Sequence, residues 1–483
     1  MKTIPVWAGT LIAAVLLSAE EPKRDNMTAE IEAVRRFRHR LLADPHRPQY
    51  HFVIPEGLAA PFDPNGAIFW KGRYHLFYIY QERGVNVLGH ISSLDLVHWR
   101  QHAPALAPTP ESPEKGIYSG NCFVNKEGEA TMIYHGIGAG NCIATSTDEL
   151  LDRWTKHPRN PIVPFPVEGA PYRPWDPHGW LEGETYYSIC GGERPALFKA
   201  EELGRWQYVG DFLHHEVPGI DPPKDNDLSC PDFFKLGNKH VLVCISHNRG
   251  GRYYVGEWKG EQFDPELHER MSWTDNLYFA NESLEDAKGR RVMWAWIFDQ
   301  RPERDRQASG WSGEMALPRE LTLGPDNRLR MRPIEELNQL RHNEQTFGPF
   351  ELKADSDQLL TGTSGDALEI LAEIEPQGAK HVGVVVRRSP NGEEGTPVFV
   401  DFEKHKLVIN SEGGPFKPAG DAVTLRVFVD RGVVEAFADD RQAVVRRCYP
   451  SRPDSLGVSL FASGGPATIR RVVVWKMFPS NPY

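Results

Sequence analysis

The sequence predicts an all-β protein in which a β-propeller is followed by a β-sandwich. Between residues 50 and 340, short runs rich in Val, Ile, Phe, Tyr and Trp alternate with turns of Gly, Pro, Asn and Asp, which is typical of successive strands. Several runs share one form: an acidic turn, a strand, a glycine turn and an aromatic strand. This loose repetition favours a propeller. After residue 345 the strand patterns are longer and alternate regularly, which favours a two-sheet sandwich.

The N-terminal segment predicts export. Residues 1–19 have the pattern of a signal peptide, because a single Lys2 precedes an apolar run too short to span a membrane and the small residues Ser18 and Ala19 end it. Residues 20–48 are expected to form one helix and an extended lead-in, since MTAEIEAVRRFRHRLLA has apolar positions at helical spacing. No later apolar run reaches spanning length, so we expect a secreted or periplasmic protein without membrane insertion.

The propeller is placed at residues 49–341 and the sandwich at residues 345–483. Expected propeller strands include AIFWKGRYHLFYIY, ATMIYHGIG, ETYYSICGG, HVLVCISHN, RYYVGEW and RVMWAWIF. Within these two parts, helix is expected only at DELLDRW, residues 148–154, and in the short linker of residues 318–341. The sandwich is expected to contain ALEILAEIE, HVGVVVRRS, TPVFVDFE, KLVINS, VTLRVFVDRGVVEAFAD, GVSLFAS and TIRRVVVWKM.

Composition limits the classes of partner. The 483 residues favour two or more domains. A net charge of −11 argues against nucleic acid and anionic membranes as partners. The six Cys lie mostly in apolar strand patterns without a CxxC pair, so we expect small buried hydrophobes rather than a disulfide framework. His residues are scattered; no metal or cofactor is therefore expected, and the oligomeric state is not indicated.

Three acidic turns open strand patterns and carry the candidate chemistry. Asp63 stands in PFDPNG, directly before an aromatic strand; by itself this pattern is also typical of a simple turn cap. WDPHGW repeats the design with Asp176, and LSCPD places Asp232 before a third strand. Such spacing predicts carboxylates that converge on one site, which is the layout that cleavage of glycosidic bonds requires.

These motifs together resemble glycoside hydrolase family 32, the family of invertases, levanases and inulinases. The resemblance runs from about residue 48 to the end and rests on PFDPNG, SGN at residues 119–121, WDP, SCPD, GWSGEMALPREL, VTLRVFVDRGVVEAFADDRQAV and GVSLFASGG. It implies a five-bladed propeller with an appended β-sandwich, a pocket on the propeller axis, and retaining chemistry on β-fructosyl bonds.

The resemblance also implies roles for individual residues. Asp63 matches the nucleophile of the family, and Asp176 matches the Asp of its Arg-Asp-Pro motif, which stabilises the developing charge through the sugar hydroxyls. An oxocarbenium-like transition state requires a nearby carboxylate on one face and fixed acceptors for hydroxyl protons. The residues expected to contact substrate are Asn65, Ser119, Trp175, Ser229 and Gln81.

The sequence departs from the family pattern at the general acid. The family has Glu-Cys-Pro-Asp, whereas this chain has Ser229 at the position of the Glu. A serine hydroxyl cannot protonate a leaving alkoxide effectively, because its pKa is far from the working pH. The sugar-binding pattern differs too: Trp175 replaces an Arg, Ile79 replaces a Gln, and residues 60–62 are Ala-Pro-Phe rather than Trp-Met-Asn. The usual sucrose or fructan specificity therefore does not follow from the motifs.

Three residues are candidates for a displaced acid. Asp232 belongs to the motif but normally supports the site, and Asp227 in DNDLS could be solvated. His178, two residues after Asp176, has a side chain suited to proton transfer, although a lone His is also typical of a hydrogen-bonding wall. The sequence leaves this choice open.

Two functions compete. The retained Asp63 and Asp176 favour an exported glycoside hydrolase or transglycosylase acting on fructosyl or other furanoside-like glycosides. Ser229 favours a carbohydrate-binding protein on the same fold whose catalysis is impaired. A structural β protein with an inert pocket is the third hypothesis.

Overall fold

The structure, a computed structural model, describes residues 24–166, 168–214, 227–273 and 276–481. The predicted signal peptide, residues 1–19, lies outside the described residues. The all-β prediction is confirmed, because the described residues form seven antiparallel sheets, and their helices are α1 (Arg24–Ala43), α2 (Glu303–Ser309) and the 3-10 helix η1 (Glu335–Leu340). Within the described chain, neither α-helix combines the length and hydropathy that a membrane-spanning helix requires.

Five sheets follow one another along the described chain between residues 64 and 333. The first two contain β1 (Pro64–Trp70), β2 (Arg73–Glu82), β3 (Val85–Ser93) and β4 (Trp99–Gln101), then β5 (Ile117–Val124), β6 (Ala130–Gly136), β7 (Gly140–Ser146), β8 (Thr155–Lys156) and β9 (Val163–Pro164). The third and fourth contain β10 (Pro177–Glu182), β11 (Thr185–Cys190), β12 (Ala196–Ala200) and β13 (Gln207–Asp211), then β14 (Ser229–Leu236), β15 (Lys239–Ser246), β16 (Gly250–Lys259) and β17 (Gln262–Arg270). The fifth contains β18 (Tyr278–Glu285), β19 (Arg291–Ile297), β20 (Glu314–Met315), β21 (Arg319–Leu323) and β22 (Leu329–Pro333).

The first strands of these sheets form a closed ring. Strand β1 contacts β5 and β18, β5 contacts β10, and β14 contacts β10 and β18. Each sheet then extends outward by antiparallel pairing of consecutive strands, except that β19 also pairs with β21 and β7 also pairs with β9. Residues at the start of each first strand therefore lie near one another although they are far apart in sequence, which is what the acidic turns before β1, β10 and β14 require.

Most strands of this ring carry a β-bulge near their beginning. The register shifts between Asn65 and Ile68 in β1 and between Ser229 and Asp232 in β14, and similar shifts occur in β5 and β18. Gly66 in the first bulge has φ +61°, and a Cβ there would lie 2.6 Å from the side chain of Met132, so glycine fits this position best. Bulges re-aim the neighbouring side chains, and they are common beside active sites.

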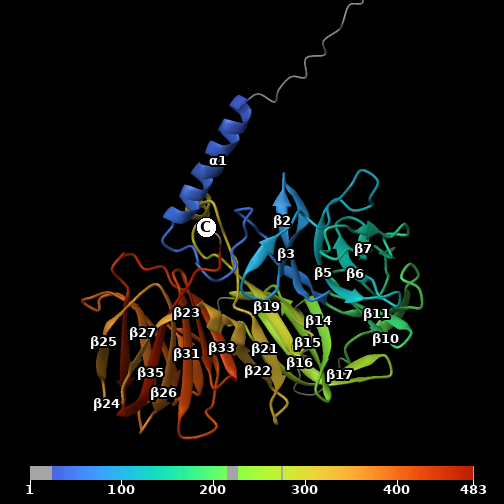
Figure 1. Cartoon of the computed structure of the whole chain (residues 1–483). Helices are drawn as coiled ribbons and strands as arrows, with labels where there is room; N and C mark the ends of the chain where they lie inside the picture. The colour runs from blue at the N-terminus through green and yellow to red at the C-terminus, as the bar shows by residue number, and fades with distance from the viewer. Residues whose placement is uncertain (1–23, 167, 215–226, 274–275, 482–483) are drawn as a thin grey trace, which may run out of the picture.

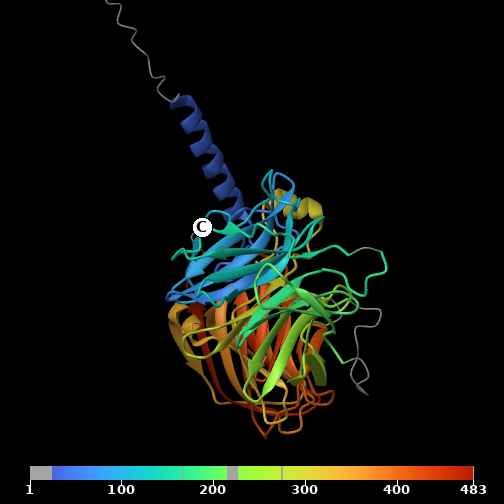
Figure 2. The same cartoon turned by 90° about the vertical axis from the view of Figure 1, so that its right-hand side faces the viewer.

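Two further sheets pack face to face as a sandwich. One contains β23 (Arg341–Phe347), β24 (Phe350–Leu352), β26 (Ala367–Glu375), β31 (Val423–Asp430), β32 (Val433–Ala438), β33 (Gln442–Arg447) and β35 (Ala467–Met477). The other contains β25 (Ser356–Ser364), β27 (His381–Arg388), β28 (Thr396–Asp401), β29 (Lys406–Ile409), β30 (Glu412–Pro415) and β34 (Gly457–Ser463). Their alternating apolar residues, such as Val384, Val398 and Val427, form one buried cluster. Figure 1 shows this sandwich in orange and red beside the earlier sheets, and Figures 1 and 2 both show α1 projecting away from them.

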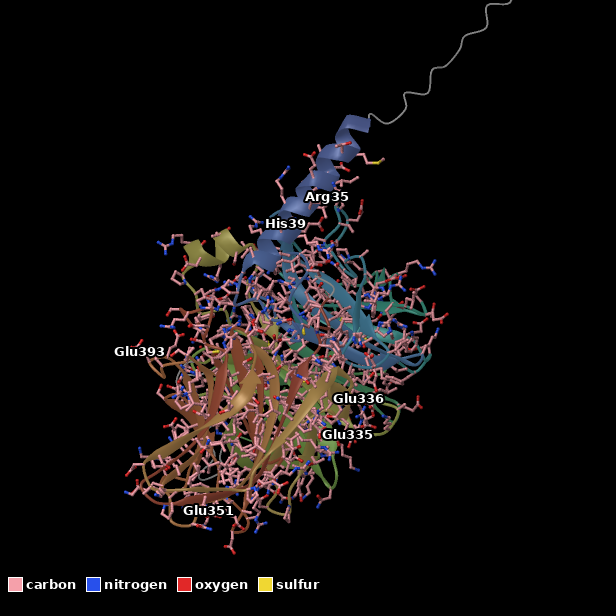
Figure 3. The ribbon with its side chains drawn as sticks, turned by 60° about the vertical axis from the view of Figure 1, so that its left-hand side comes forward. Arg35, His39, Glu335, Glu336, Glu351 and Glu393 are labelled. Atoms are coloured by element: carbon pink, nitrogen blue, oxygen red, sulfur yellow. The ribbon has the colours of Figure 1, made fainter. Side chains whose placement is uncertain are left out.

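A buried polar network joins the two parts. The Asp430 carboxylate accepts hydrogen bonds from the backbone N–H groups of residues 49–51 and from His51 Nδ1 at 2.9 Å. His51 Nε2 lies 3.3 Å from Glu435, which also accepts from Arg319 at 2.7 Å. Burial lowers the pKa of His51, but the two acidic partners outweigh this effect and raise the pKa to about 9. The linker is tied to the fifth sheet as well, because Glu336 of η1, labelled in Figure 3, accepts from Arg290 at 2.7 Å.

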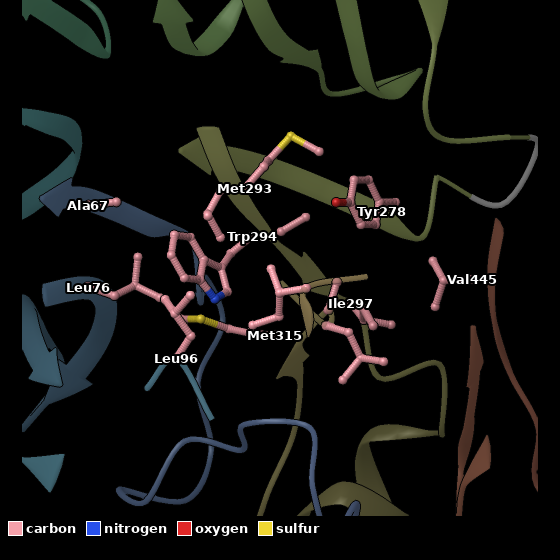
Figure 4. Packing of buried hydrophobic residues seen from close by; sticks show 14 of the residues in the cluster. Ala67, Leu76, Leu96, Tyr278, Met293, Trp294, Ile297, Met315 and Val445 are labelled. Atoms are coloured by element: carbon pink, nitrogen blue, oxygen red, sulfur yellow. The ribbon is translucent and has the colours of Figure 1, made fainter. Parts of the chain in front are cut away.

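Apolar packing continues across the same boundary. Figure 4 shows Trp294 of β19 among Leu76, Leu96 and Met315, while Val445 of the sandwich approaches from the opposite side. All five side chains are buried in one cluster. The fifth sheet is therefore packed between the first sheet and the sandwich, which limits relative movement of the two parts.

Of the two helix predictions in this region, that at residues 148–154 was wrong and that at residues 318–341 was confirmed only at its end. Residues 148–154 form bends rather than a helical turn, and Trp154 donates to the carbonyl of Leu151 at 2.8 Å. The stretch from residue 318 to 341 contains strands β21 and β22, and only η1 is helical. Arg319 and Leu321 pair with β19, so the fifth sheet overrides local helix propensity. The short α2 was not predicted; all its residues remain at least partly exposed, so no apolar periodicity marks it.

Candidate active site

Asp63 lies at the entrance to β1 with its backbone fixed on two sides. Its carbonyl accepts from the backbone N–H of Ile79 at 3.2 Å and from the side-chain amide of Asn65 at 3.1 Å. Its Oδ2 accepts from the Ser119 hydroxyl at 2.9 Å, and its Oδ1 has no hydrogen-bond partner among the described residues. Asn65 and Ser119, both predicted to contact substrate, therefore position this carboxylate, which keeps one oxygen unengaged.

Asp176 lies close to Asp63, as the spacing of the acidic turns predicts. Its Oδ2 accepts from the backbone N–H of Cys230 at 3.2 Å and from the thiol at 3.7 Å. The same thiol lies 3.9 Å from Asp63 Oδ2 and 3.5 Å from the hydroxyl of Ser119. Two carboxylates from different sheets therefore converge on one cysteine.

Cys230 is a site residue that sequence reasoning missed. It occupies the β14 bulge with φ +46°, an uncommon conformation for a residue with a side chain, and this turns its backbone N–H and thiol toward the carboxylates. Burial raises the thiol pKa well above its usual value of 9, and the two carboxylates raise it further. Cys230 therefore remains a neutral donor. All six cysteines are free, and the sequence pattern indicated only packing for this one.

Both carboxyls have perturbed pKa values. Burial raises the pKa of Asp63 to about 6, and the Ser119 hydroxyl opposes this shift. Burial and then the charge of Asp63 raise the pKa of Asp176 to about 7. Perturbed carboxyls held close together are a feature of catalytic sites rather than of turn caps.

The predicted acid candidates occupy different surroundings. Burial lowers the pKa of His178 to about 3; its Nε2 lies 3.0 Å from the carbonyl of Phe233. Asp232 accepts from the Ser283 hydroxyl at 2.5 Å and is almost fully buried, which raises its pKa to about 6. Both therefore lie in a buried polar layer, which suits supporting residues.

That buried layer contains an acid that the sequence did not indicate. Glu282 of β18 accepts from the backbone N–H of Ala67 at 2.9 Å, which joins the fifth sheet to β1. Burial and the neighbouring Asp232 raise its pKa well above the usual value, while Arg291 opposes both shifts. An acidic residue inside the strand pattern YFANESLE was the available signal.

Ser229 provides no acidic group, but its hydroxyl takes part in a chain of hydrogen bonds. The buried Ser229 hydroxyl donates to Asp227 Oδ2 at 2.6 Å and accepts from the indole N–H of Trp175 at 3.1 Å. Asp227 Oδ2 in turn lies 2.5 Å from Nδ1 of His247. His247, at the end of β15, was not among the sequence candidates.

The last predicted substrate residue lies apart from these groups. Gln81 is exposed at the end of β2, opposite Asn86. No contact between Gln81 and the carboxylates is present in the structure. The site is therefore built from the turns before β1, β10 and β14 together with Ser119 of β5.

One group of described residues has the spacing of metal ligands: His90, His102 and Asp152. The two imidazole rings are stacked at 4.2 Å with 22° between their planes. A metal ion lies in the plane of each imidazole that binds it, so nearly parallel rings cannot direct their lone pairs to one ion. His102 also bonds Asp152 at 2.6 Å and Ser92 at 2.7 Å. We assign this cluster to structural hydrogen bonding.

Paired buried carboxylates are the arrangement that cleavage of a glycosidic bond requires. Comparison with known families agrees: the pattern of the glycosyl hydrolases family 32 N-terminal domain matches residues 51–333, and that of the family 32 C-terminal domain matches residues 336–476. The chain belongs to glycoside hydrolase family 32.

Individual members of this family that are similar to the chain include hydrolases of several fructosides. Sucrose-6-phosphate hydrolase of Zymomonas mobilis is 29% identical over 96% of this chain and 98% of its own. Levanase of Bacillus subtilis is 31% identical over 91% of this chain and 72% of its own. Fructan 1-exohydrolase IIa of Cichorium intybus has a similar fold, with a TM-score of 0.79 at 22% identity, covering 90% of this chain and 98% of its own. This protein is thus a β-fructosidase-like glycoside hydrolase that acts on carbohydrate.

Proposed function

We propose that the protein is an exported β-fructosidase that hydrolyses terminal fructosyl bonds with retention of configuration. The observation that carries this proposal is the convergence of Asp63 and Asp176 on Ser119 and Cys230. Asp63 serves as the nucleophile, because it is fixed by its backbone and keeps one unengaged oxygen. Asp176 accepts hydroxyl protons of the sugar and stabilises positive charge that develops on the ring.

The proposed catalytic cycle has two steps. The Asp63 carboxylate attacks the anomeric carbon while the bond to the leaving oxygen breaks and that oxygen is protonated, which gives a glycosyl-enzyme. Water then attacks the same carbon, loses a proton to a base and releases Asp63. The Ser119 hydroxyl and the Cys230 thiol support the ionised form of Asp63, since both lower its pKa.

The names of the relatives support a β-fructoside as substrate, because they include a sucrose-6-phosphate hydrolase and a levanase. The signal-peptide pattern of residues 1–19 supports export to the periplasm or beyond. We further propose that the five sheets between residues 64 and 333 are the five blades of a propeller, since their first strands form a closed ring.

The test is a substrate screen with the secreted protein. Hydrolysis of sucrose, levan, inulin, arabinans and aryl furanosides is followed by release of reducing sugar. The proposal requires turnover of at least one fructoside, initial release of β-fructofuranose by NMR, and loss of turnover in Asp63→Asn. Turnover that persists in Asp63→Asn, or initial release of the inverted sugar, would contradict it.

A carbohydrate-binding protein remains the second candidate, and one observation favours it. The Ser229 hydroxyl donates a hydrogen bond to Asp227, so its proton is not directed at a leaving group. On this alternative, sucrose or a fructan binds in calorimetry without turnover of any substrate, activated aryl fructosides included.

A further inference from the structure

The first residue of β14 supplies no acid, and its contacts show what it does instead. Ser229 is fully buried; its hydroxyl accepts from Trp175 and donates to Asp227 Oδ2 at 2.6 Å. A hydroxyl engaged in this way cannot protonate a leaving oxygen. It fixes the Asp227 carboxylate beside the residues that contact Asp63 and Asp176, because Cys230 is the next residue in the chain.

Asp227 also fixes His247 across the first two strands of the fourth sheet. Its Oδ2 lies 2.5 Å from Nδ1 of His247, and its Oδ1 accepts from the backbone N–H of the same residue at 3.1 Å. The Ser246 hydroxyl donates to the Asp227 carbonyl at 2.6 Å. Four hydrogen bonds in all, counting that from Ser229, therefore hold one carboxylate residue against the end of β15.

His247 is open to solvent, whereas the paired carboxyls are buried. The side chain of Asp227 is 26% exposed and that of His247 is 64% exposed, whereas Asp63 is 9% exposed. The Phe279 ring from β18 packs against the imidazole in a T-shaped arrangement with the ring centroids 5.8 Å apart, and the Asn276 amide donates to the backbone carbonyl of His247 at 3.1 Å. Nδ1 is occupied by Asp227, so proton transfer falls to Nε2.

Charges around the ring favour its protonated form. The hydrogen bond to Asp227 raises the pKa of His247 above 6.5, partial burial opposes this, and the charges of Asp227, Asp176 and Asp63 raise it further. Conversely, the imidazolium charge lowers the pKa of both catalytic carboxyls. His247 is thus electrostatically coupled to the reacting pair. His178, by contrast, is buried, and its pKa is lowered to about 3.

We propose that His247, oriented by Asp227, is the general acid and base of this enzyme. The inference rests on the proposed function. In the first step, Asp63 bonds to the anomeric carbon, the glycosidic bond breaks, and its electron pair takes the proton from Nε2 of His247. In the second step, neutral His247 accepts a proton from the attacking water as the bond to Asp63 breaks. A carboxylate that orients an imidazole and stabilises the imidazolium is an established catalytic arrangement.

The test compares His247→Gln with the matched control His98→Gln. His98 is also an exposed histidine bonded to an aspartate, since its Nδ1 lies 2.9 Å from Asp95 and its side chain is 54% exposed. Each variant is assayed on sucrose and on 4-nitrophenyl β-fructofuranoside, whose leaving group needs little protonation. We expect His247→Gln to lose about 10²–10⁴-fold in kcat/KM on sucrose and less than about tenfold on the aryl fructoside. His98→Gln should match the wild type on both.

A second readout separates catalysis from structure. In wild type, kcat/KM should fall as the pH rises through the pKa of His247, and this alkaline limb should disappear in His247→Gln. Asp227→Asn should move the limb to lower pH, because the partner that raises the pKa is lost. Adding Ser229→Glu to His247→Gln should restore part of the activity on sucrose.

The outcomes distinguish this inference from the proposed function. Equal losses on both substrates, or an unchanged alkaline limb in His247→Gln, overturn the role of His247. If His247→Gln keeps full activity on sucrose while Asp63→Asn is inactive, the fructosidase stands and the inference fails. If the wild type cleaves no fructoside, the proposed function fails and the inference fails with it.

Discussion

Ser119→Ala should raise the pH at which the enzyme becomes active. The Ser119 hydroxyl donates to Asp63 Oδ2 at 2.9 Å and lowers the pKa of a carboxyl that burial has raised to about 6. A hydrogen bond to a charged group is worth about 1.5–3 kcal/mol, and one pKa unit corresponds to about 1.4 kcal/mol. Removing the hydroxyl therefore destabilises the carboxylate and should raise its pKa by about one to two units.

The measurement is the pH dependence of kcat/KM, whose acidic limb reports ionisation of the carboxyl pair in the free enzyme. That limb should move upward by about one to two units in Ser119→Ala, while the rate at the optimum falls less than tenfold. Ser188→Ala is the control, because Ser188 is fully buried in β11 and its hydroxyl binds only the carbonyl of Ile189 among the described groups. An acidic limb that stays in place, or moves to lower pH, would refute the assigned role of this hydrogen bond.

Four further predictions concern the same network and the boundary between the two parts. Asp63→Asn should reduce turnover of every substrate below detection in a rate assay, while calorimetry still detects sucrose binding, because no covalent intermediate can form. Asp176→Asn should lower kcat about 10²–10³-fold. It should also move the acidic limb of the pH profile to lower pH, because a second carboxylate no longer repels the charge of Asp63. A limb that does not move would mean that the two carboxyls are uncoupled. Asp430→Asn should cost about 3–5 kcal/mol in urea unfolding, because His51 loses the nearer of its two buried acidic partners. In wild type, the stabilisation from His51 is fully present below pH 6.5 and is lost as pH rises through about 9; unfolding free energies that do not fall over this range would refute it.

Local patterns predicted the strands well, because the alternation of apolar and polar residues that marks a strand involves only residues that are neighbours in the sequence. AIFWKGRYHLFYIY became β1 and β2, and VTLRVFVDRGVVEAFAD became β31 and β32, each as an antiparallel hairpin. Strand β21 at residues 319–323, which lies inside the predicted helical linker of residues 318–341, was missed for the opposite reason. Its pairing with β19 is a long-range contact that local propensity cannot indicate.

The site was predictable only in part. Asp63 and Asp176 were found because each combines a turn signal with an acidic residue before a strand. Cys230 was missed because in sequence it is one more small residue beside a strand, and its role depends on the left-handed backbone of the bulge. Ser119 was expected to contact sugar; its observed partner is Asp63, a contact made only when β1 and β5 become neighbours.

The register of one hairpin explains why His247 could not be found from the sequence. From the turn outward, β14 and β15 pair Leu236 with Lys239 and Asp232 with Val243. Continued without interruption, this register would place Asp227 opposite residue 248. The bulge at Cys230 shifts the pairing by one residue, so that Ser229 lies opposite Ile245.

Asp227 therefore lies opposite His247, and the two side chains meet at 2.5 Å. A shift of one residue also exchanges the faces on which side chains point, so the same bulge that turns Cys230 toward the carboxylates brings His247 to Asp227. In the proposed mechanism, a carboxylate at position 229 and a histidine at position 247 are then alternative ways to supply a proton from the same end of β14 and β15. Deleting Cys230 should remove the bulge. The contact of Cys230 with Asp63 would then be lost, and His247 would no longer lie opposite Asp227, so the alkaline limb of the pH profile should disappear as well. If the alkaline limb remains after this deletion, the position of His247 does not depend on the bulge.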